Sequence, residues 1–381
     1  MILCCNPHAQ YLSHKDEIDR AIASVLESGW YVFGQEVAAF EHEFAQFLGV
    51  RHAVGVGSGT DAIRLALLAC DIGPGDEVIT VSHTAVATVT AIKLAGASPV
   101  LVDIEGDYFT IDPNRLESAI RPQTKAIVLV HLYGQAADVT AVKEIADRHN
   151  LRIIEDCAQC HGATYQGKQR GYQEQSLGSF GDVGCFSFYP TKNLSAFGDG
   201  GAVVTNDPKL AKQIRKLREY GWSETRESTL VGMNSRLDEI QAAVLRVKLR
   251  YLDADNEARG RIAARYDAAL AETPLRAPQV RPESTHIYHQ YVVQTDRRDE
   301  LLAHLKSHRV AALVHYPRPV HLQSAYQGRL RGCDDLPQTE NVVRRILSLP
   351  IYPELTQEDQ RHVVGTINNF AAARDDRRRA A

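Results

Sequence analysis

The segment "LRIIEDCA", residues 151–158, decides the fold because it is an apolar run without polar alternation that ends in an acidic pair. Five more runs are also mainly apolar without polar alternation: "EVITVS" (77–82), "SPVLVDI" (98–104), "KAIVLVHL" (125–132), "DVGCFSF" (182–188) and "GAVVTN" (201–206). Strands that are apolar on both faces and are separated by helices of roughly 10 to 15 residues are typical of a mostly parallel sheet covered by helices on both sides. The sequence therefore predicts an α/β fold.

Helical periodicity fills the segments around these runs. "EVAAFEHEFAQFLG" (36–49) places four apolar side chains on one stripe of a helix: Val37, Phe40, Phe44 and Phe47. "TDAIRLALLAC" (60–70) indicates a buried helix. These patterns support the layered α/β arrangement.

The second half of the chain changes character after residue 234. "SRLDEIQAAVLRVKLRYLDADNEARGRIAARYDAALAE" (235–272) predicts one long helix, in which Gly260 is the only strong break. The shorter strand and helix patterns beyond it indicate a small α+β unit. At 381 residues the chain is long enough for two domains, so we expect a large α/β domain over 1–250 and a small C-terminal α+β domain over 251–381.

Composition excludes several classes of protein. A net charge of -4, from 43 basic and 47 acidic residues, argues against a nucleic-acid binder, which needs a cationic surface. The first residues contain no basic stretch followed by an apolar one, and no segment offers 18 uncharged apolar residues, so we expect a cytoplasmic protein that does not enter a membrane. The seven cysteines, an odd number, are then expected to be free thiols.

Three candidate reactive groups follow predicted strands, where the carboxyl ends of parallel strands place ligand sites. Asp156 ends the run at 151–158, and the small residues 57–60 ("GSGT") open a helix in the way that aims backbone N–H groups at a phosphate. Lys192 lies in the aromatic segment "FSFYPTKNLSAF" (186–197), where a water-poor setting lowers the pKa of an amine and makes it nucleophilic. An amine, a buried carboxylate and a phosphate cradle together are what pyridoxal 5'-phosphate requires.

A different chemistry competes at the same place. Cys157, Cys160 and His161 spell the C-x-x-C-H pattern of haem attachment, and His286 and His289 ("HIYH") are weak metal candidates. Neither an export signal nor a second ligand pair at comparable spacing accompanies them, so we expect small buried thiols and no metal. A redox or metal protein remains the alternative from another functional class.

In their residues and in their order along the chain, the motifs resemble those of the DegT/DnrJ/EryC1/StrS family of fold-type I, pyridoxal-phosphate-dependent nucleotide-sugar aminotransferases. The segments that carry the resemblance are "SGWYVFGQEVAAFEHEFAQFLGVRHAVGVGSGTDA" (28–62), "EDCAQ" (155–159), "FSFYPTKNLSAFGDGGAVVTN" (186–206), "GMNSRLDEIQAAVL" (232–245) and "SLPIYPEL" (348–355). They cover nearly the whole chain. The resemblance implies an aspartate aminotransferase-like fold.

The resemblance also implies roles for individual residues. Lys192 becomes the Schiff-base lysine and proton shuttle, Asp156 the partner of the pyridine nitrogen, and Gln159 a contact of the ring hydroxyl. The implied phosphate ligands are Gly59, Thr60, Ser187 and, from the neighbouring subunit of a homodimer with a shared active site, Asn234. Relatives place an aromatic ring over the cofactor where this chain has Ala85, so His83 becomes a candidate for stacking.

The implied reaction is transamination. Related sugar dehydratases carry histidine at the position of Lys192, and lysine there favours transfer of an amino group from L-glutamate to a keto nucleotide sugar. Tyr189, His315 and Tyr316 match the sugar pocket of the branch that acts at C3 of dTDP-3-keto-6-deoxyhexoses. A sugar 4-aminotransferase is the alternative within the family, with UDP or GDP in place of dTDP left open, and a cofactor-binding regulator without turnover is a third hypothesis.

Overall fold

The computed structural model describes residues 1–167 and 174–379. The elements of its first half are α1 (Pro7–Ser13), α2 (Lys15–Ser28), α3 (Gln35–Leu48), β1 (His52–Val56), α4 (Gly59–Ala69), β2 (Glu77–Val81), α5 (Val86–Leu94), β3 (Ser98–Val102), η1 (Pro113–Arg115), α6 (Leu116–Ala119), β4 (Thr124–Val130), η2 (Leu132–Gly134), α7 (Val139–His149) and β5 (Arg152–Asp156). The second half contains β6 (Thr164–Tyr165), β7 (Gln175–Ser176), β8 (Val183–Ser187), β9 (Gly201–Thr205), α8 (Pro208–Leu217), α9 (Glu239–Leu249), α10 (Leu252–Leu270), β10 (Tyr291–Gln294), α11 (Arg298–Ser307), η3 (Val320–Leu322), α12 (Pro337–Arg345), β11 (Ile346–Leu349) and α13 (Gln357–Arg379).

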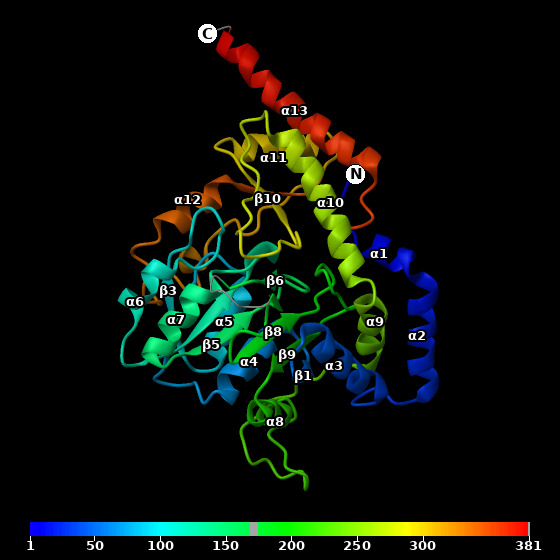
Figure 1. Cartoon of the computed structure of the whole chain (residues 1–381), viewed down its shortest axis with the longest axis vertical. Helices are drawn as coiled ribbons and strands as arrows, with labels where there is room; N and C mark the ends of the chain where they lie inside the picture. The colour runs from blue at the N-terminus through cyan, green and yellow to red at the C-terminus, as the bar shows by residue number, and fades with distance from the viewer. Residues whose placement is uncertain (168–173, 380–381) are drawn as a thin grey trace.

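A seven-stranded sheet in the order β1-β9-β8-β5-β4-β2-β3 forms the centre of the molecule (Figure 1). The pairs β3/β2, β2/β4, β4/β5 and β5/β8 are parallel, whereas β9 runs antiparallel to both of its neighbours. All six apolar runs of the sequence are strands of this sheet. The predicted α/β fold with a mostly parallel central sheet is confirmed, and the carboxyl ends of its parallel strands share one edge.

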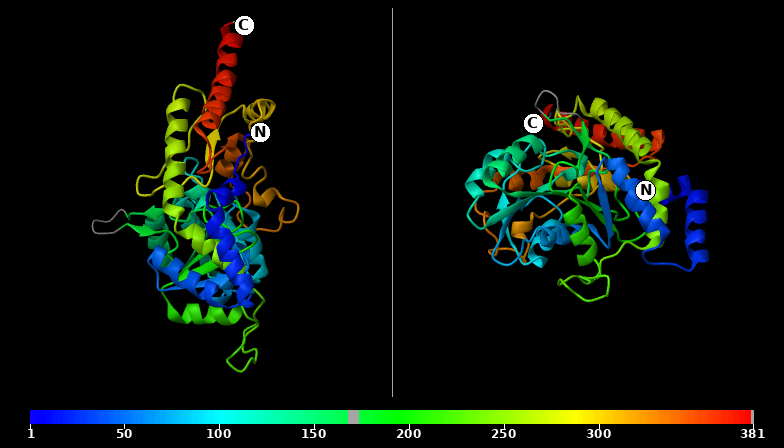
Figure 2. Two further views of the ribbon diagram at one scale, coloured as in Figure 1. Left: turned by 90° about the vertical axis from the view of Figure 1, so that its right-hand side faces the viewer. Right: turned by 60° about the horizontal axis from the view of Figure 1, so that its bottom comes forward.

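Helices cover both faces of the sheet, as Figure 2 shows from two further directions. The neighbours Ile153 and Ile154 of β5 point to opposite sides and belong to two separate hydrophobic clusters. One cluster includes side chains of α3, α7 and α9, and the other includes side chains of α4, α5 and α8. Burial on both faces explains why these strands lack polar alternation.

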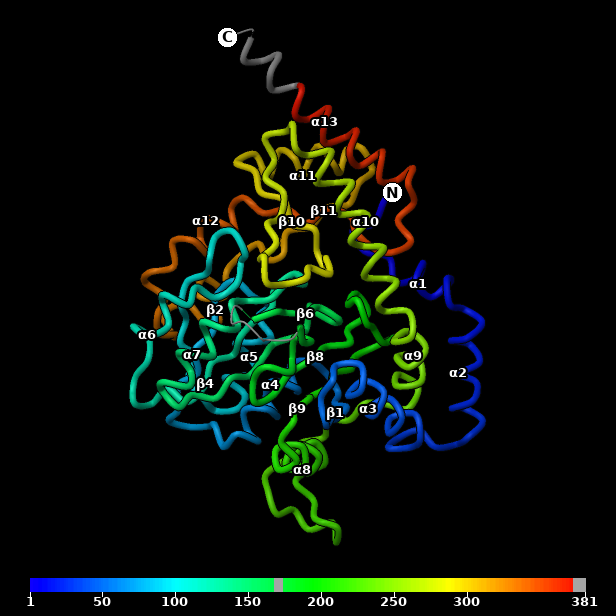
Figure 3. Tube along the Cα trace, in the orientation of Figure 1, coloured from blue at the N-terminus to red at the C-terminus, as the bar shows by residue number. Residues whose placement is uncertain are grey.

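A third hydrophobic cluster lies in the C-terminal part, where α10, α11 and α13 pack around the antiparallel pair β10 and β11 (Figure 3). The first residues of the chain join this part, because Ile2 pairs with Val310 and the backbone N–H of Ile351 donates to the carbonyl of Cys4. The division of the chain near residue 250 stays a prediction.

The predicted single helix over 235–272 is wrong. The structure has two helices, α9 and α10, that meet at residues 250–251, and Gly260 lies inside α10 with open space where a Cβ would stand. The break falls where the chain passes from the sheet-covering cluster to the C-terminal cluster, so packing and not local sequence sets it. Within residues 1–167 and 174–379, no helix combines the length and the hydrophobicity that crossing a membrane requires.

Candidate active site

Side chains from several loops converge at the carboxyl edge of the sheet. Asp156 is the last residue of β5 and Ser187 is the last residue of β8, which pairs directly with β5. Lys192 follows in the loop between β8 and β9, and the Gly59–Thr60 pair opens α4 immediately after β1. The fold therefore brings together the groups that the sequence placed after separate strands.

Asp156 is a buried carboxylate with a donor on each oxygen. The Thr88 hydroxyl donates to Oδ2 over 2.7 Å, and the backbone N–H of Ala158 donates to Oδ1 over 3.2 Å. Burial raises the pKa of Asp156, whereas the hydrogen bonds from Thr88 and Ala158 and the charge of Lys192 lower it. Each carboxylate oxygen keeps a lone pair that can accept one further hydrogen bond.

Lys192 provides an amine in the same region. Removal from water lowers the pKa of Lys192 to about 8, and the carboxylate of Asp156 opposes this shift. The side chain is partly exposed and lines a pocket whose other walls come from distant segments of the chain, including Gln10, Arg259 and Tyr352. The side chain therefore faces this pocket, and the lowered pKa leaves about a tenth of the Lys192 amines as free base at pH 7.

Three buried or partly buried histidines lie near enough to Lys192 for its charge to affect their pKa values. The charge of Lys192, added to the larger effect of burial, lowers the pKa of His315 to about 4, lowers that of His161 to about 3, and holds that of His289 well below its usual range. Neutral imidazoles around Lys192 add no positive charge to the pocket. Of the charged groups that act on Lys192, the Asp156 carboxylate has the largest effect in raising its pKa.

Gln159 connects two loops of the site. Its Oε1 accepts a hydrogen bond from the backbone N–H of Tyr133 over 2.8 Å, and its Nε2 donates to the hydroxyl of Tyr316 over 3.0 Å. Tyr133 in turn donates its hydroxyl proton to the carbonyl of His315. The structure thus joins Gln159 to His315 and Tyr316, two of the three residues predicted to line a sugar pocket. Tyr189, the third, is 52 % exposed in the loop before Lys192.

The start of α4 has the features of a phosphate cradle. The Ser58 hydroxyl caps the helix by accepting from the N–H of Asp61, which leaves the first N–H groups of the helix, at Gly59 and Thr60, pointing outward. Ser187 packs so closely that a Cβ at position 59 would lie 2.6 Å from the Cβ of Ser187. Only glycine leaves this backbone accessible beside the Ser187 hydroxyl.

Asn234 lies in a different setting from the other predicted ligands. It is exposed, at the end of the segment after α8 that extends from the bottom of the molecule in Figure 1. Its neighbour Ser235 turns inward, where the hydroxyl accepts from the N–H of Gly57 over 2.9 Å and donates to Asp61 over 2.7 Å. The predicted contact of Asn234 with a second subunit remains a prediction.

The sequence analysis named His83 as a candidate for stacking and did not identify Tyr133. The structure places the two side chains in contact. Because Tyr133 donates its only hydroxyl proton to His315, His83 Nε2 must donate to the Tyr133 hydroxyl, at 2.8 Å. His83 is fully buried and also contacts the ring of Phe109. Its predicted stacking over a cofactor stays untested, and its observed contact is with the ring and hydroxyl of Tyr133.

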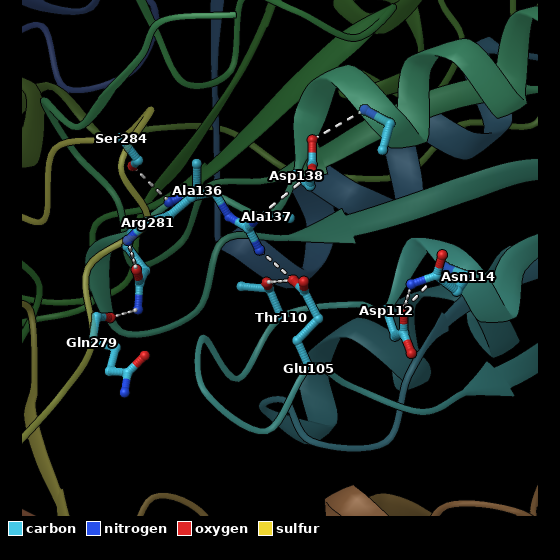
Figure 4. Close-up of polar contacts among 12 residues, drawn as sticks. Glu105, Thr110, Asp112, Asn114, Ala136, Ala137, Asp138, Gln279, Arg281 and Ser284 are labelled. Carbon is cyan, nitrogen blue, oxygen red and sulfur yellow. Dashed lines mark hydrogen bonds and ion pairs between the residues drawn. The ribbon is translucent and has the colours of Figure 1, made fainter. Parts of the chain in front are cut away.

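A polar network supports the turn that carries Tyr133. Figure 4 shows it where the 105–114 loop meets Ala136 and the segment around Arg281. Arg281 donates to Glu105, and its guanidinium lies 4.2 Å from the centre of the Tyr108 ring. The N–H of Ala136 donates to Ser284 Oγ over 3.1 Å, so the turn is fixed from both sides.

The C-x-x-C-H residues point away from solvent. Cys157, Cys160 and His161 are each fully buried, and burial raises the pKa of both thiols, which keeps them protonated. Among residues 1–167 and 174–379, the group with metal-like spacing is His131, Glu155 and Cys157, which includes neither Cys160 nor His161. Hydrogen bonds already occupy the carboxylate oxygens of Glu155.

Comparison with known proteins shows which family the chain is similar to. The model of the DegT/DnrJ/EryC1/StrS aminotransferase family matches residues 13–368. The chain is 47 % identical to dTDP-3-amino-3,4,6-trideoxy-alpha-D-glucose transaminase from Streptomyces venezuelae, over 95 % of this chain and 94 % of the relative. It is 42 % identical to a UDP-N-acetyl-3-dehydro-alpha-D-glucosamine 3-aminotransferase from Acidithiobacillus ferrooxidans, over 92 % of both chains.

The fold agrees with the same family. The crystal structure of DesV from Streptomyces venezuelae superposes with a TM-score of 0.93 and 46 % sequence identity, over 97 % of this chain and 98 % of that one. Family and fold together confirm the predicted aminotransferase. The chain belongs to the DegT/DnrJ/EryC1/StrS aminotransferase family.

Proposed function

We propose that this protein transfers the amino group of L-glutamate to C3 of a dTDP-3-keto-6-deoxyhexose. As a member of its family it is a pyridoxal-phosphate-dependent aminotransferase that acts on a keto nucleotide sugar. The observation that carries the proposal is the convergence of Lys192 and Asp156 beside the cradle at Gly59, in a chain that matches a dTDP-3-amino-sugar transaminase over nearly its full length.

The residues present are suited to the cofactor. The buried Asp156 has a free lone pair for a protonated ring nitrogen, and Gln159 lies beside it for the ring hydroxyl. The close approach of Ser187 to Gly59 leaves backbone and hydroxyl donors for the phosphate. When bound there, pyridoxal phosphate supplies a reactive carbonyl and a ring that withdraws electrons from the carbon to be deprotonated.

The chain's own groups handle the protons. An amine with a pKa of about 8 is free base in about a tenth of the molecules at pH 7, so Lys192 can accept a proton and return it without a strong base. Burial raises the pKa of Asp156, and the hydrogen bonds from Thr88 and Ala158 and the charge of Lys192 limit that rise. Lys192 therefore moves the proton at the reacting carbon, and Asp156 holds the one at the ring.

The proposed regiochemistry rests on the residues that we expect to contact the sugar. Tyr316 is oriented by Gln159, and His315 is oriented by a hydrogen bond of 2.9 Å between its Nδ1 and Ser348 Oγ. Both residues, with the exposed Tyr189, are proposed to hold the keto sugar with C3 toward Lys192. Relatives named for dTDP and for UDP sugars both align over more than nine-tenths of the chain, and the higher identity favours dTDP.

The assembly belongs to the same proposal. Exposed Asn234 is proposed to reach the phosphate site of a second subunit, which would make the homodimer the active unit. Its neighbour Ser235 anchors the segment to Gly57 at the base of the same cradle, so the segment is fixed close to the phosphate site at one end.

The proposal is tested with a panel of keto sugars. Purified enzyme and L-glutamate are mixed with 3-keto and 4-keto sugars linked to dTDP, UDP or GDP, and 2-oxoglutarate and the aminated sugar are measured by mass. We expect turnover with the dTDP-linked 3-keto sugar and none in the Lys192→Ala variant. Preferred turnover of a 4-keto sugar would refute the proposed amination at C3, and preferred turnover of a UDP sugar would refute dTDP as the nucleotide of the substrate.

A further inference from the structure

Two threonines form a hydroxyl chain that ends on Asp156. Thr84 Oγ1 lies 3.0 Å from Thr88 Oγ1, and Thr88 Oγ1 lies 2.7 Å from Asp156 Oδ2. Thr84 is 3 % exposed and Thr88 is fully buried, so water does not replace either contact. The chain therefore connects the carboxylate to the polypeptide just before α5.

The ionisation of Asp156 fixes the direction of these hydrogen bonds. An ionised carboxylate only accepts, so the single hydroxyl proton of Thr88 must point at Oδ2. Thr88 then accepts the proton of Thr84, and both hydroxyls are aligned toward the negative charge. If Asp156 were protonated on Oδ2, the direction of the whole chain would have to reverse.

The position of Thr88 adds a second favourable effect. Ala85 is the N-cap of α5, so Thr88 is the third residue of the helix and holds Asp156 against its first turn. The positive end of a helix dipole favours a nearby anion. The N-cap itself makes no side-chain hydrogen bond, which leaves Thr88 as the polar side chain that joins this turn to the carboxylate.

We propose that Thr88, aligned by Thr84, is a positioning residue that keeps Asp156 ionised and oriented toward the ring nitrogen of the cofactor. This inference rests on the proposed function, because it concerns the same site. Thr88 acts through Asp156: its loss leaves Ala158 N–H as the remaining hydrogen-bond donor to a carboxylate that burial already disfavours. A more readily protonated Asp156 would hold the cofactor ring less tightly.

The test measures binding of pyridoxamine 5'-phosphate by equilibrium dialysis. This ligand lacks the aldehyde that Lys192 captures covalently, so its Kd reports contacts to the ring and phosphate. Thr88→Val keeps the shape and removes the hydroxyl, and Thr88→Ser restores the hydroxyl. Thr90→Val is the matched control, because Thr90 is on the same helix and its hydroxyl lies 2.7 Å from the hydroxyl of Tyr326, away from Asp156.

Thr88→Val should raise the Kd about tenfold or more, as expected for losing a hydrogen bond to a charged group. The pH below which binding is lost should also move upward, because a carboxylate with a higher pKa is protonated at a higher pH. Thr88→Ser and Thr90→Val should bind as the wild type does. Should Thr88→Val fail to fold, Thr84→Val, which keeps the Thr88 hydroxyl, should show a smaller change in the same direction.

The outcomes separate the two proposals. A folded Thr88→Val variant with unchanged Kd and pH profile would overturn the role of Thr88 and leave the aminotransferase proposal intact. Equal loss in Thr88→Val and Thr88→Ser would also overturn it, because shape and not the hydroxyl would then matter. Failure of the wild-type protein itself to bind pyridoxamine phosphate would instead refute the cofactor assignment.

Discussion

Glu155→Gln should destabilise the protein strongly although glutamine has nearly the same shape. Four hydrogen-bond donors converge on the buried Glu155 carboxylate: the N–H groups of Gly178, Phe180 and Gly181, at 2.7 to 2.8 Å, and His131 Nε2, at 3.0 Å. His131 cannot change tautomer to help, because its Nδ1 accepts from the N–H of Ala137. A glutamine amide offers one oxygen, so two donors lose their acceptor and face an NH₂ group.

The expected magnitude follows from that count. Each buried donor left without an acceptor costs about 1–3 kcal/mol, so two of them predict a loss of about 2–6 kcal/mol in the free energy of unfolding. Urea unfolding at neutral pH, followed by far-UV circular dichroism, measures the difference. Glu144→Gln, at an exposed position on α7, is the control and should change the free energy of unfolding by less than about 0.5 kcal/mol.

The same carboxylate predicts a pH dependence. His131 and the backbone donors lower the pKa of Glu155 below its usual value although burial opposes them. A lowered pKa in the folded state gives stability that is present above the unfolded pKa, about 4.3, and is lost as the pH falls through the folded value. The wild type should therefore lose its advantage over Glu155→Gln in acid. A loss below about 1 kcal/mol at neutral pH, or an advantage that persists in acid, would refute the assignment of four donors to this charge.

Three further predictions concern the site and the helix that follows it. Gly59→Ala should weaken pyridoxamine phosphate binding at least about tenfold, because its Cβ would lie 2.6 Å from Ser187 Cβ; equal Kd values by dialysis would contradict the cradle. Gly260→Ala, with open space around the new methyl group in α10, should raise the free energy of unfolding by about 0.5–1 kcal/mol. A lower free energy of unfolding, measured with urea, would contradict the open space at this position. The rate at which apoenzyme captures pyridoxal phosphate should rise with pH through the Lys192 pKa of about 8 and level off above about pH 9, where most of the amine is free base. A stopped-flow rate that still climbs steeply toward pH 10 would contradict the lowered pKa.

The central sheet could be predicted because six of its strands are each marked by a short stretch of sequence. Each of the six strands is a short apolar run buried on both faces, and the parallel pairing then places every loop that follows a strand at one edge. This is why Asp156 and Lys192, 36 positions apart in the sequence, were expected in one site. The antiparallel direction of β9 was not assigned, although its connection to β8 contains no helix.

Long-range contacts account for what sequence reasoning missed. Thr88 contacts Asp156 across 68 positions, and Tyr133 contacts His315 across 182, so no local pattern identifies either residue. The contact between Thr84 and Thr88 is local, but Thr84 precedes the N-cap of α5, so the spacing rule for pairs within a helix does not identify it. The break between α9 and α10 also had no local signal, because the residues at 250–251 are Arg and Tyr, which helices accommodate.

In the turn at residues 156–160, the function of a motif depends on which way its side chains point. Asp156 and Gln159 meet polar partners from Thr88, Tyr133 and Tyr316, whereas Cys157 and Cys160 join the hydrophobic cluster on one face of the sheet. The two patterns, D-x-x-Q and C-x-x-C, thus occupy the same residues and serve different sides of one turn. Cys157 is fully buried and packs beside Gly178, where an added Cβ would lie 3.3 Å from its Sγ. A buried cysteine packs as a small hydrophobic side chain, so packing beneath the candidate site is sufficient to account for the C-x-x-C pattern.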